Sequence, residues 1–137
     1  MSAFSNYLET QIANWINGSA FASSTTLSGG TWVQLYTADP GDGASPTGAV
    51  YARFNVPASG WTVGVNTATP PATTITNAAQ ILITNNAPSA QTITHVAVFT
   101  ASTGGEMLFY GALGSSKSVA LGDEVRFNIG QLTLAIN

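Results

Sequence analysis

The side chains that could carry out acid–base chemistry in this sequence are one histidine and six acidic residues. The histidine, His95, lies in the run HVAVFTASTGGEMLFYGAL, which also contains Glu106. A general base needs a partner within hydrogen-bond reach and a surrounding cleft. Gly104 and Gly105 predict a turn between two strands, which would leave His95 and Glu106 at opposite ends of the apolar segments. We therefore expect a β-hairpin in which both are strand residues and not a catalytic pair.

The motif DPGDG, residues 39–43, brings two carboxylates next to glycine. Calcium takes six or more oxygens, usually from acids at alternate positions, whereas Asp39 and Asp42 are three apart with Pro40 between them. A type I or II turn with Pro40 at its second position explains the same residues. Cysteine is absent, which excludes thiol catalysis and thiolate metal sites. With no phosphate loop or nucleophile elbow either, we expect no enzymatic activity, no metal and no cofactor.

The composition is unusual in its low charge. Charged residues make up 7% of the 137 residues, against about 25% in ordinary soluble domains. Three basic residues, Arg53, Lys117 and Arg126, cannot neutralise a phosphate backbone, so we expect no nucleic-acid partner. A formal net charge of −3 gives little repulsion between copies, which suits dense symmetric packing. The alternative is a protein that simply carries threonine and serine on its outside.

No stretch reaches the ~20 apolar residues that a membrane helix needs, so we expect no membrane partner. The first residues, MSAFSNYLETQIANWINGSA, lack the basic start and continuous apolar run of a secretion signal.

A helix is predicted over about residues 3–17, because apolar residues recur there with the spacing of one helix face. Ser2 would cap its start and Gly18 would end it. This apolar face either docks a partner or, as we favour, lies across the protein's own sheet. The residues on it are Phe4, Leu8, Ile12, Trp15 and Ile16.

The rest of the chain is β in character. Short runs rich in β-branched and aromatic residues alternate with clusters of Gly, Pro, Asn, Ser or Asp. We predict one domain over residues 1–137, with a helix in 1–18 and an antiparallel, jelly-roll-like β-sandwich in 19–137. The predicted strands are 31–37, 49–56, 79–84, 94–101, 106–113 and 124–129, with GWTVGV and KSVAL as weaker candidates.

The alternation of apolar residues shifts by one position at Gly130. Val125, Phe127 and Ile129 occupy odd positions, whereas Leu132, Leu134 and Ile136 occupy even ones. Either a bulge at Gly130–Gln131 keeps both sets inward, or the second set serves a different sheet.

Three tryptophans and four tyrosines raise a further alternative, a sugar-stacking platform. Trp61, in PASGWTVGV, is the one that we expect to be most exposed, because glycines flank its strand. In most proteins, however, such aromatic residues are packed in the core.

Taken in order, these segments resemble a family of small tailed-phage virion proteins, known as tail-fibre or capsid-associated structural proteins. The resemblance runs from FSNYLETQIANWINGSAF through WVQLYTADPGDG, YARFNV and ITNAAQILI to ITHVAVFTASTGGEMLFYGAL and KSVALGDEVRFNIGQLTLAIN. The sequence departs from the usual pattern in the loops NTATPPATT and SGGTW. The resemblance implies a structural part of a phage particle, assembled in the host cytoplasm.

Three functions remain open: a capsid decoration or cement protein, which we favour, a tail or tail-fibre component, and a host-surface carbohydrate-binding module. The first is favoured because the chain has no fibre repeat and no collagen-like or coiled-coil shaft. The partner would be the major capsid protein or another virion protein. A chain of this size has only marginal stability alone, so we expect an oligomer, and a trimer would fit local threefold positions between capsid hexamers. Contacts would use one end of the sandwich, with Asp39, Pro40, Asp42 and Trp61 as candidates.

Overall fold

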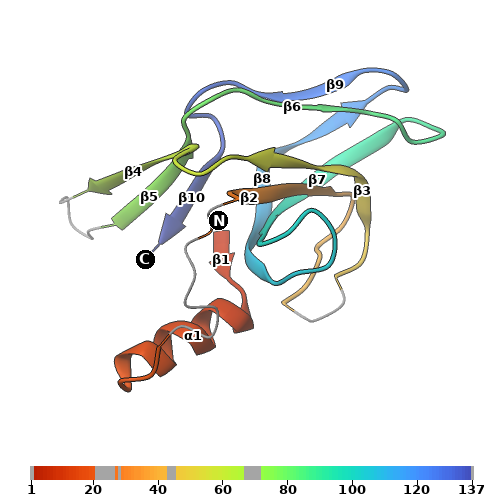
Figure 1. Cartoon of the computed structure of the whole chain (residues 1–137). Helices are drawn as coiled ribbons and strands as arrows, with labels where there is room; N and C mark the ends of the chain where they lie inside the picture. The colour runs from red at the N-terminus through yellow and green to blue at the C-terminus, as the bar shows by residue number, and fades with distance from the viewer. Residues whose placement is uncertain (1, 21–26, 28, 43–45, 67–71, 137) are drawn as a thin grey trace.

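The structure, a computed structural model, describes residues 2–20, 27, 29–42, 46–66 and 72–136. This part of the chain forms ten strands and one helix (Figure 1). The elements are β1 (Ser2–Phe4), α1 (Asn6–Ile16), β2 (Thr31–Tyr36), β3 (Ala49–Val56), β4 (Trp61–Asn66), β5 (Ala72–Asn77), β6 (Ile81–Thr84), β7 (Gln91–Phe99), β8 (Met107–Val119), β9 (Glu124–Phe127) and β10 (Thr133–Ile136).

The strands form three antiparallel sheets. A five-stranded sheet has the order β1-β8-β7-β2-β3, a three-stranded sheet the order β10-β5-β4, and β6 pairs with β9. The prediction of a mainly β fold with antiparallel sheets and one N-terminal helix is confirmed.

The main core lies on one face of the five-stranded sheet. There Val33, Leu35, Val96 and Val98 meet side chains from both smaller sheets, including Ile81, Phe127 and Leu134. The second layer of the sandwich is therefore divided between two sheets. The opposite face of the large sheet carries a smaller apolar cluster, formed by Tyr36, Ala97, Phe99 and Met107 with Trp32 and Tyr110 beside it.

The helix is shorter than predicted, because Ser2–Phe4 is a strand. β1 pairs with β8, and the Phe4 and Phe109 rings lie 5.1 Å apart. Ser5, not Ser2, is the N-cap, so the predicted start and cap were wrong. Tyr7 and Leu8, in the first turns of α1, pack against the core, and the far end of the helix projects away from the sheets (Figure 1). No helix in the described ranges is long and apolar enough to cross a membrane.

Gly130 marks a change of sheet. It lies in a turn with φ of 77°, between β9, which pairs with β6, and β10, which pairs with β5. Ile129 points to solvent, whereas Leu132 and Leu134 are buried. The bulge interpretation is wrong, and the alternative, a second set serving a different sheet, is right.

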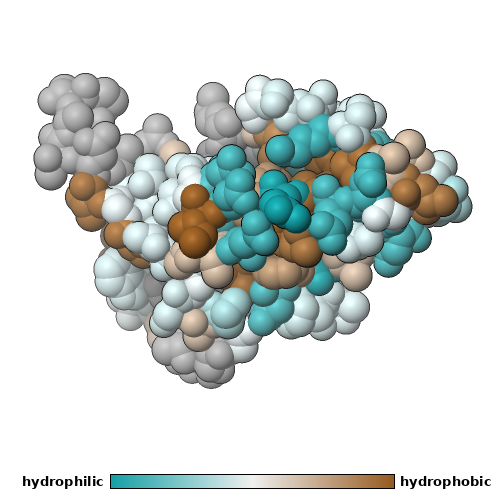
Figure 2. All heavy atoms as spheres, turned by 90° about the horizontal axis from the view of Figure 1, so that it is seen from above, coloured by the Kyte–Doolittle hydropathy of each residue, from teal (hydrophilic) through white to brown (hydrophobic). Residues whose placement is uncertain are grey.

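Hydrophilic side chains cover much of the surface seen from above, and separate hydrophobic patches lie among them (Figure 2). One of these patches lies beside the grey atoms at the end of the molecule where β4 and β5 are found.

Candidate functional site

The hairpin of β7 and β8 does not bring His95 and Glu106 together. His95 pairs with Ala112, and its Nδ1 lies 2.8 Å from Thr94 Oγ1. Glu106 lies at the other end, in the turn just before β8, where its N–H donates to Thr100 Oγ1. The prediction of strand residues is right for His95 and wrong for Glu106. Within the described ranges, no group of three or more His, Cys, Asp or Glu residues could hold a metal ion.

The DPGD segment forms the compact turn that its sequence predicts. Asp39 Oδ1 accepts a hydrogen bond of 2.9 Å from the N–H of Gly41, whose φ of 71° suits glycine. Pro40 is buried, and Asp39 is exposed. Among Asp39, Pro40 and Gly41, Asp39 is therefore the residue whose side chain is available to a partner.

Asp42 connects this turn to the start of α1. Its Oδ1 accepts the N–H of Asn6 at 2.6 Å, and its carbonyl accepts the Asn6 side-chain amide at 3.0 Å. A carboxylate at the first residue of a helix also interacts favourably with the helix dipole. The loop after β2 and the helix therefore form one unit.

Ser5 fixes the same end of the helix to the large sheet. Its hydroxyl accepts the N–H of Leu8 at 3.3 Å and donates to the Met107 carbonyl, and its own N–H donates to the Leu108 carbonyl at 3.0 Å. Trp15 and Ile16 lie at the opposite end of α1. Trp15 is 60% exposed there and Ile16 is 74% exposed.

The surface between the turn and the helix is acidic. Burial raises the pKa of the Tyr110 hydroxyl, and the carboxylates of Asp42, Asp39 and Glu9 raise it further. These three acids therefore lie close enough to act on one hydroxyl.

Arg53 joins β3 to the turn of the β7–β8 hairpin. Its Nη1 donates to the carbonyls of Ala101 at 2.7 Å and Gly104 at 2.8 Å, while its Nε donates to Gln34 Oε1 at 3.3 Å. The guanidinium carbon lies 3.6 Å from the centre of the Phe99 ring. Burial lowers the pKa of Arg53, although Tyr36 acts in the opposite direction. Arg53, one of the three basic residues, therefore uses its charge for contacts within the molecule.

The side-chain amide of Gln34 binds the backbone of β3 where that strand is irregular. It donates to the carbonyls of Val50 at 2.7 Å and Tyr51 at 3.0 Å, where the pairing between β2 and β3 shifts. Tyr51 has a φ of 65°, and its buried hydroxyl makes no hydrogen bond. This bulge is therefore locally strained and held by side chains.

Trp61 lies apart from the DPGD turn. Its indole N–H donates to Thr31 Oγ1 at 2.8 Å, and its ring packs against the main core. β4, which begins with this residue, and the loop between β2 and β3 are on opposite sides of Figure 1. The structure therefore does not bring all four predicted contact residues together, and their role in partner binding stays a prediction.

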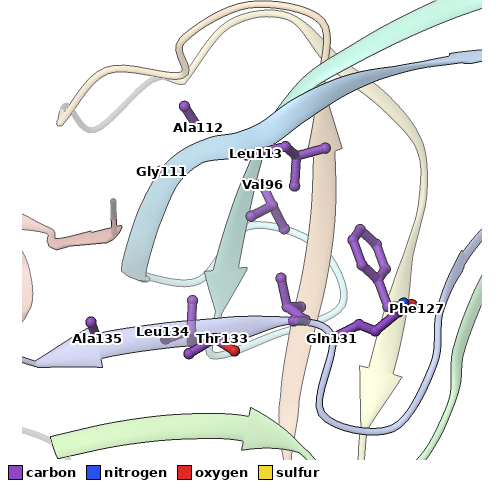
Figure 3. Close-up of a pocket in the computed structure, with 11 residues that line it drawn as sticks. Val96, Gly111, Ala112, Leu113, Phe127, Gln131, Thr133, Leu134 and Ala135 are labelled. Carbon is purple, nitrogen blue, oxygen red and sulfur yellow. The ribbon is translucent and has the colours of Figure 1, made fainter.

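A cavity of about 280 Å³ opens between the bend of β8 and the segment that enters β10 (Figure 3). Val96, Leu113 and Phe127 point toward this space, whereas Ala112 points away. Its lining residues carry no charge, so it suits an apolar side chain better than a charged ligand.

Ser5 and Asn6 fix the start of α1, and Arg53 fixes the turn of the β7–β8 hairpin. None of these three residues was predicted from the sequence to have such a role. Serine is a preferred N-cap, so Ser5 had a detectable signal, but Ser2 carried the same one. The contacts of Arg53 join residues 48 positions apart and have no local signature.

The model of one protein family, described as Podophage GP4 fiber I protein gp80, matches residues 3–135. The match runs from β1 into β10 and so covers nearly all of the chain. No curated protein matches the sequence.

Proposed function

This chain belongs to the family described as Podophage GP4 fiber I protein gp80 and is a structural protein of a tailed-phage particle; from that premise we propose that it is a component of a phage fiber. The single observation that supports the fiber assignment is the family match over residues 3–135. In this role the protein binds other virion proteins and catalyses no reaction.

The proposed contact surface is α1 together with the turn that Asp42 ties to it. Ser5 and Asp42 hold the first turn of the helix, so the projecting part is presented in a fixed direction. The tip of the helix exposes Trp15 and Ile16. When a partner buries an aromatic side chain of this kind, that side chain commonly contributes much of the binding energy. The exposed carboxylate of Asp39 and the acids near Tyr110 would add polar contacts at the rim.

A variant with Trp15→Ser and Ile16→Ser tests this surface. We expect its incorporation into particles, measured by quantitative mass spectrometry, to fall by more than about tenfold, because truncating a buried aromatic anchor costs roughly 2 kcal/mol or more. Its melting temperature should stay close to that of the wild type, since both side chains are largely exposed. Ile129→Ser is the matched control, because Ile129 is 70% exposed and lies in the turn after β9, not on α1. Normal incorporation of the double variant would refute the helix contact.

The position in the virion needs a separate measurement. Electron microscopy of particles carrying a labelled chain should show density on fibers. Density confined to the head would replace the fiber assignment by head decoration, for which the sparse charge is equally suitable. The trimer expected from the sequence rested on threefold positions of a capsid lattice, so it belongs to that alternative.

Carbohydrate binding is not favoured by a specific observation. The indole N–H of Trp61 is already bonded to Thr31, and its ring packs against the core. A glycan array with the isolated protein would detect such an activity.

A further inference from the structure

β4 is the open edge of the three-stranded sheet. β5 is the only strand with which it pairs in the described part of the chain. The other outer strands have neighbours: β10 lies beside β1, β3 beside β6, and β9 beside β8. β4 and β5 also extend from the body toward one end of the molecule (Figure 1).

The backbone of β4 offers hydrogen-bonding groups at this edge. The N–H of Ala78 donates to the Gly60 carbonyl at 2.9 Å, and the same antiparallel register continues with Thr62 opposite Thr76. Alternate residues of an antiparallel pair bond to the partner strand. The N–H and C=O groups of Val63 and Val65 therefore point away from β5, toward the open side.

The side chains of β4 do not protect this edge. Val63 is 66% exposed and Val65 is 72% exposed, and both lie on the same face of the strand. Proteins usually guard an open edge with lysine, proline or an inward charge. No charged residue or histidine occurs in the whole stretch from residue 54 to residue 94, and β4 contains no proline. Figure 2 shows hydrophobic surface at this end.

We propose that β4 pairs with β4 of a second copy, antiparallel, across a twofold axis near Gly64. A strand edge is self-complementary under such an axis, and no like charges meet because the sheet carries none. Val63 of one copy then lies opposite Val65 of the other, and the exposed valines of both copies are buried together. This pairing goes beyond the fiber assignment and does not depend on where in the virion the protein lies.

Sedimentation of the purified protein over a concentration series tests the proposal. The wild type should reach twice the 14.0 kDa of the single chain. Val65→Pro should stay monomeric, because it removes an outward N–H while an edge strand tolerates proline there. Val65→Lys should also be monomeric, because it would bury a charged side chain against the apolar Val63 of the other copy. Ile129→Lys, at a residue of similar exposure, should dimerise like the wild type.

Melting temperatures establish that each variant is folded, and Val65→Lys decides the question if Val65→Pro unfolds. The absence of cysteine allows a second test with Gly64→Cys. Facing residues that do not bond across such a pair have Cα atoms ~4.5 Å apart, within disulfide reach. Oxidation should crosslink Gly64→Cys but not Ile129→Cys. A wild type that is monomeric or trimeric, or folded Val65 variants that still dimerise, would overturn the proposal.

Discussion

Replacing Arg53 by methionine removes the guanidinium and keeps an apolar stem in its place. Two charge-assisted hydrogen bonds to carbonyls and one to Gln34 are lost, together with the contact on Phe99. Hydrogen bonds of a charged group contribute roughly 1.5–3 kcal/mol each when buried. The bond to Gly104 is exposed, so water replaces much of it in the variant. The bonds to Ala101 and Gln34 are only partly buried, so we count about 1.5–2 kcal/mol for the two together. With about 0.5–1 kcal/mol for the cation–π contact, we expect a total loss of about 2–3 kcal/mol.

The expected change in melting temperature follows from the size of the chain. Unfolding entropy near the midpoint is about 0.3 kcal/mol per degree for 137 residues. Arg53→Met should therefore melt about 7–10 °C below the wild type. Arg53→Lys should fall between the two, because an ammonium keeps the charge but cannot stack on Phe99 and reach Gln34 together.

Differential scanning calorimetry measures these shifts, and Arg126→Met is the matched control. Arg126 contacts Glu124 at 3.5 Å in a pair whose side chains are 56% and 40% exposed. Such pairs contribute ~0–1 kcal/mol, so the control should melt within about 3 °C of the wild type. If Arg53→Met melts together with Arg126→Met, Arg53 does not hold the hairpin turn to β3, and the reasoning from its contacts is wrong.

Three further substitutions have expected outcomes that thermal unfolding can check. Tyr51→Phe should stabilise the protein by about 1 kcal/mol, because the buried hydroxyl of Tyr51 has no hydrogen-bond partner; a lower melting temperature would show that this hydroxyl is satisfied. Gly130→Val should cost on the order of 1–3 kcal/mol through its positive φ alone, since a Cβ there meets no atom within 4 Å; a melting curve identical to wild type would contradict it, and Gly130→Asn should cost less. Asp42→Ala should cost about 0.5–2 kcal/mol, because the start of α1 loses an acceptor and a favourable charge; no loss would mean that the loop does not support the helix.

The strands were readable from the sequence where local pattern and burial agree. β3 has the predicted bounds of 49–56, and the turn at Gly104 and Gly105 lies where it was expected, because both residues have positive φ. β5, with the sequence ATTITN, was missed because threonine dominates it and its apolar face is small. β1 was read as helix because Phe4 continues the helical spacing of Leu8 and Ile12. This segment is a strand because it pairs with β8, which is distant in the sequence.

The contact surface was less predictable than the fold. Glycine, proline and acids correctly marked the DPGD turn, but the sequence did not show that Pro40 is buried and that Asp42 binds Asn6. The apolar side chains at the end of α1 were assigned to a face lying on the sheet. The helix leaves the sheet after its first turns, so Trp15 and Ile16 are exposed, as in the docking alternative. The spacing of apolar residues predicts which face of a helix is apolar. It does not predict how much of that face packs against the rest of the protein.

Sparse charge leads to a last prediction, on the salt dependence of assembly. Several of the few charged side chains already have partners in the molecule, with Arg53 on the hairpin turn, Asp42 on the helix and Arg126 on Glu124. Association through the proposed β4 pair must then depend on apolar and uncharged polar groups, because β4, β5 and β10 carry no charged residue. Salt at ~0.5 M screens exposed charges within a few ångströms but leaves such contacts intact. The dissociation constant of the dimer should therefore change less than about twofold between ~0.05 and ~0.5 M sodium chloride, and sulfate should strengthen the dimer by favouring burial. A dimer that weakens more than about tenfold over the same range would show that charge–charge contacts hold it together.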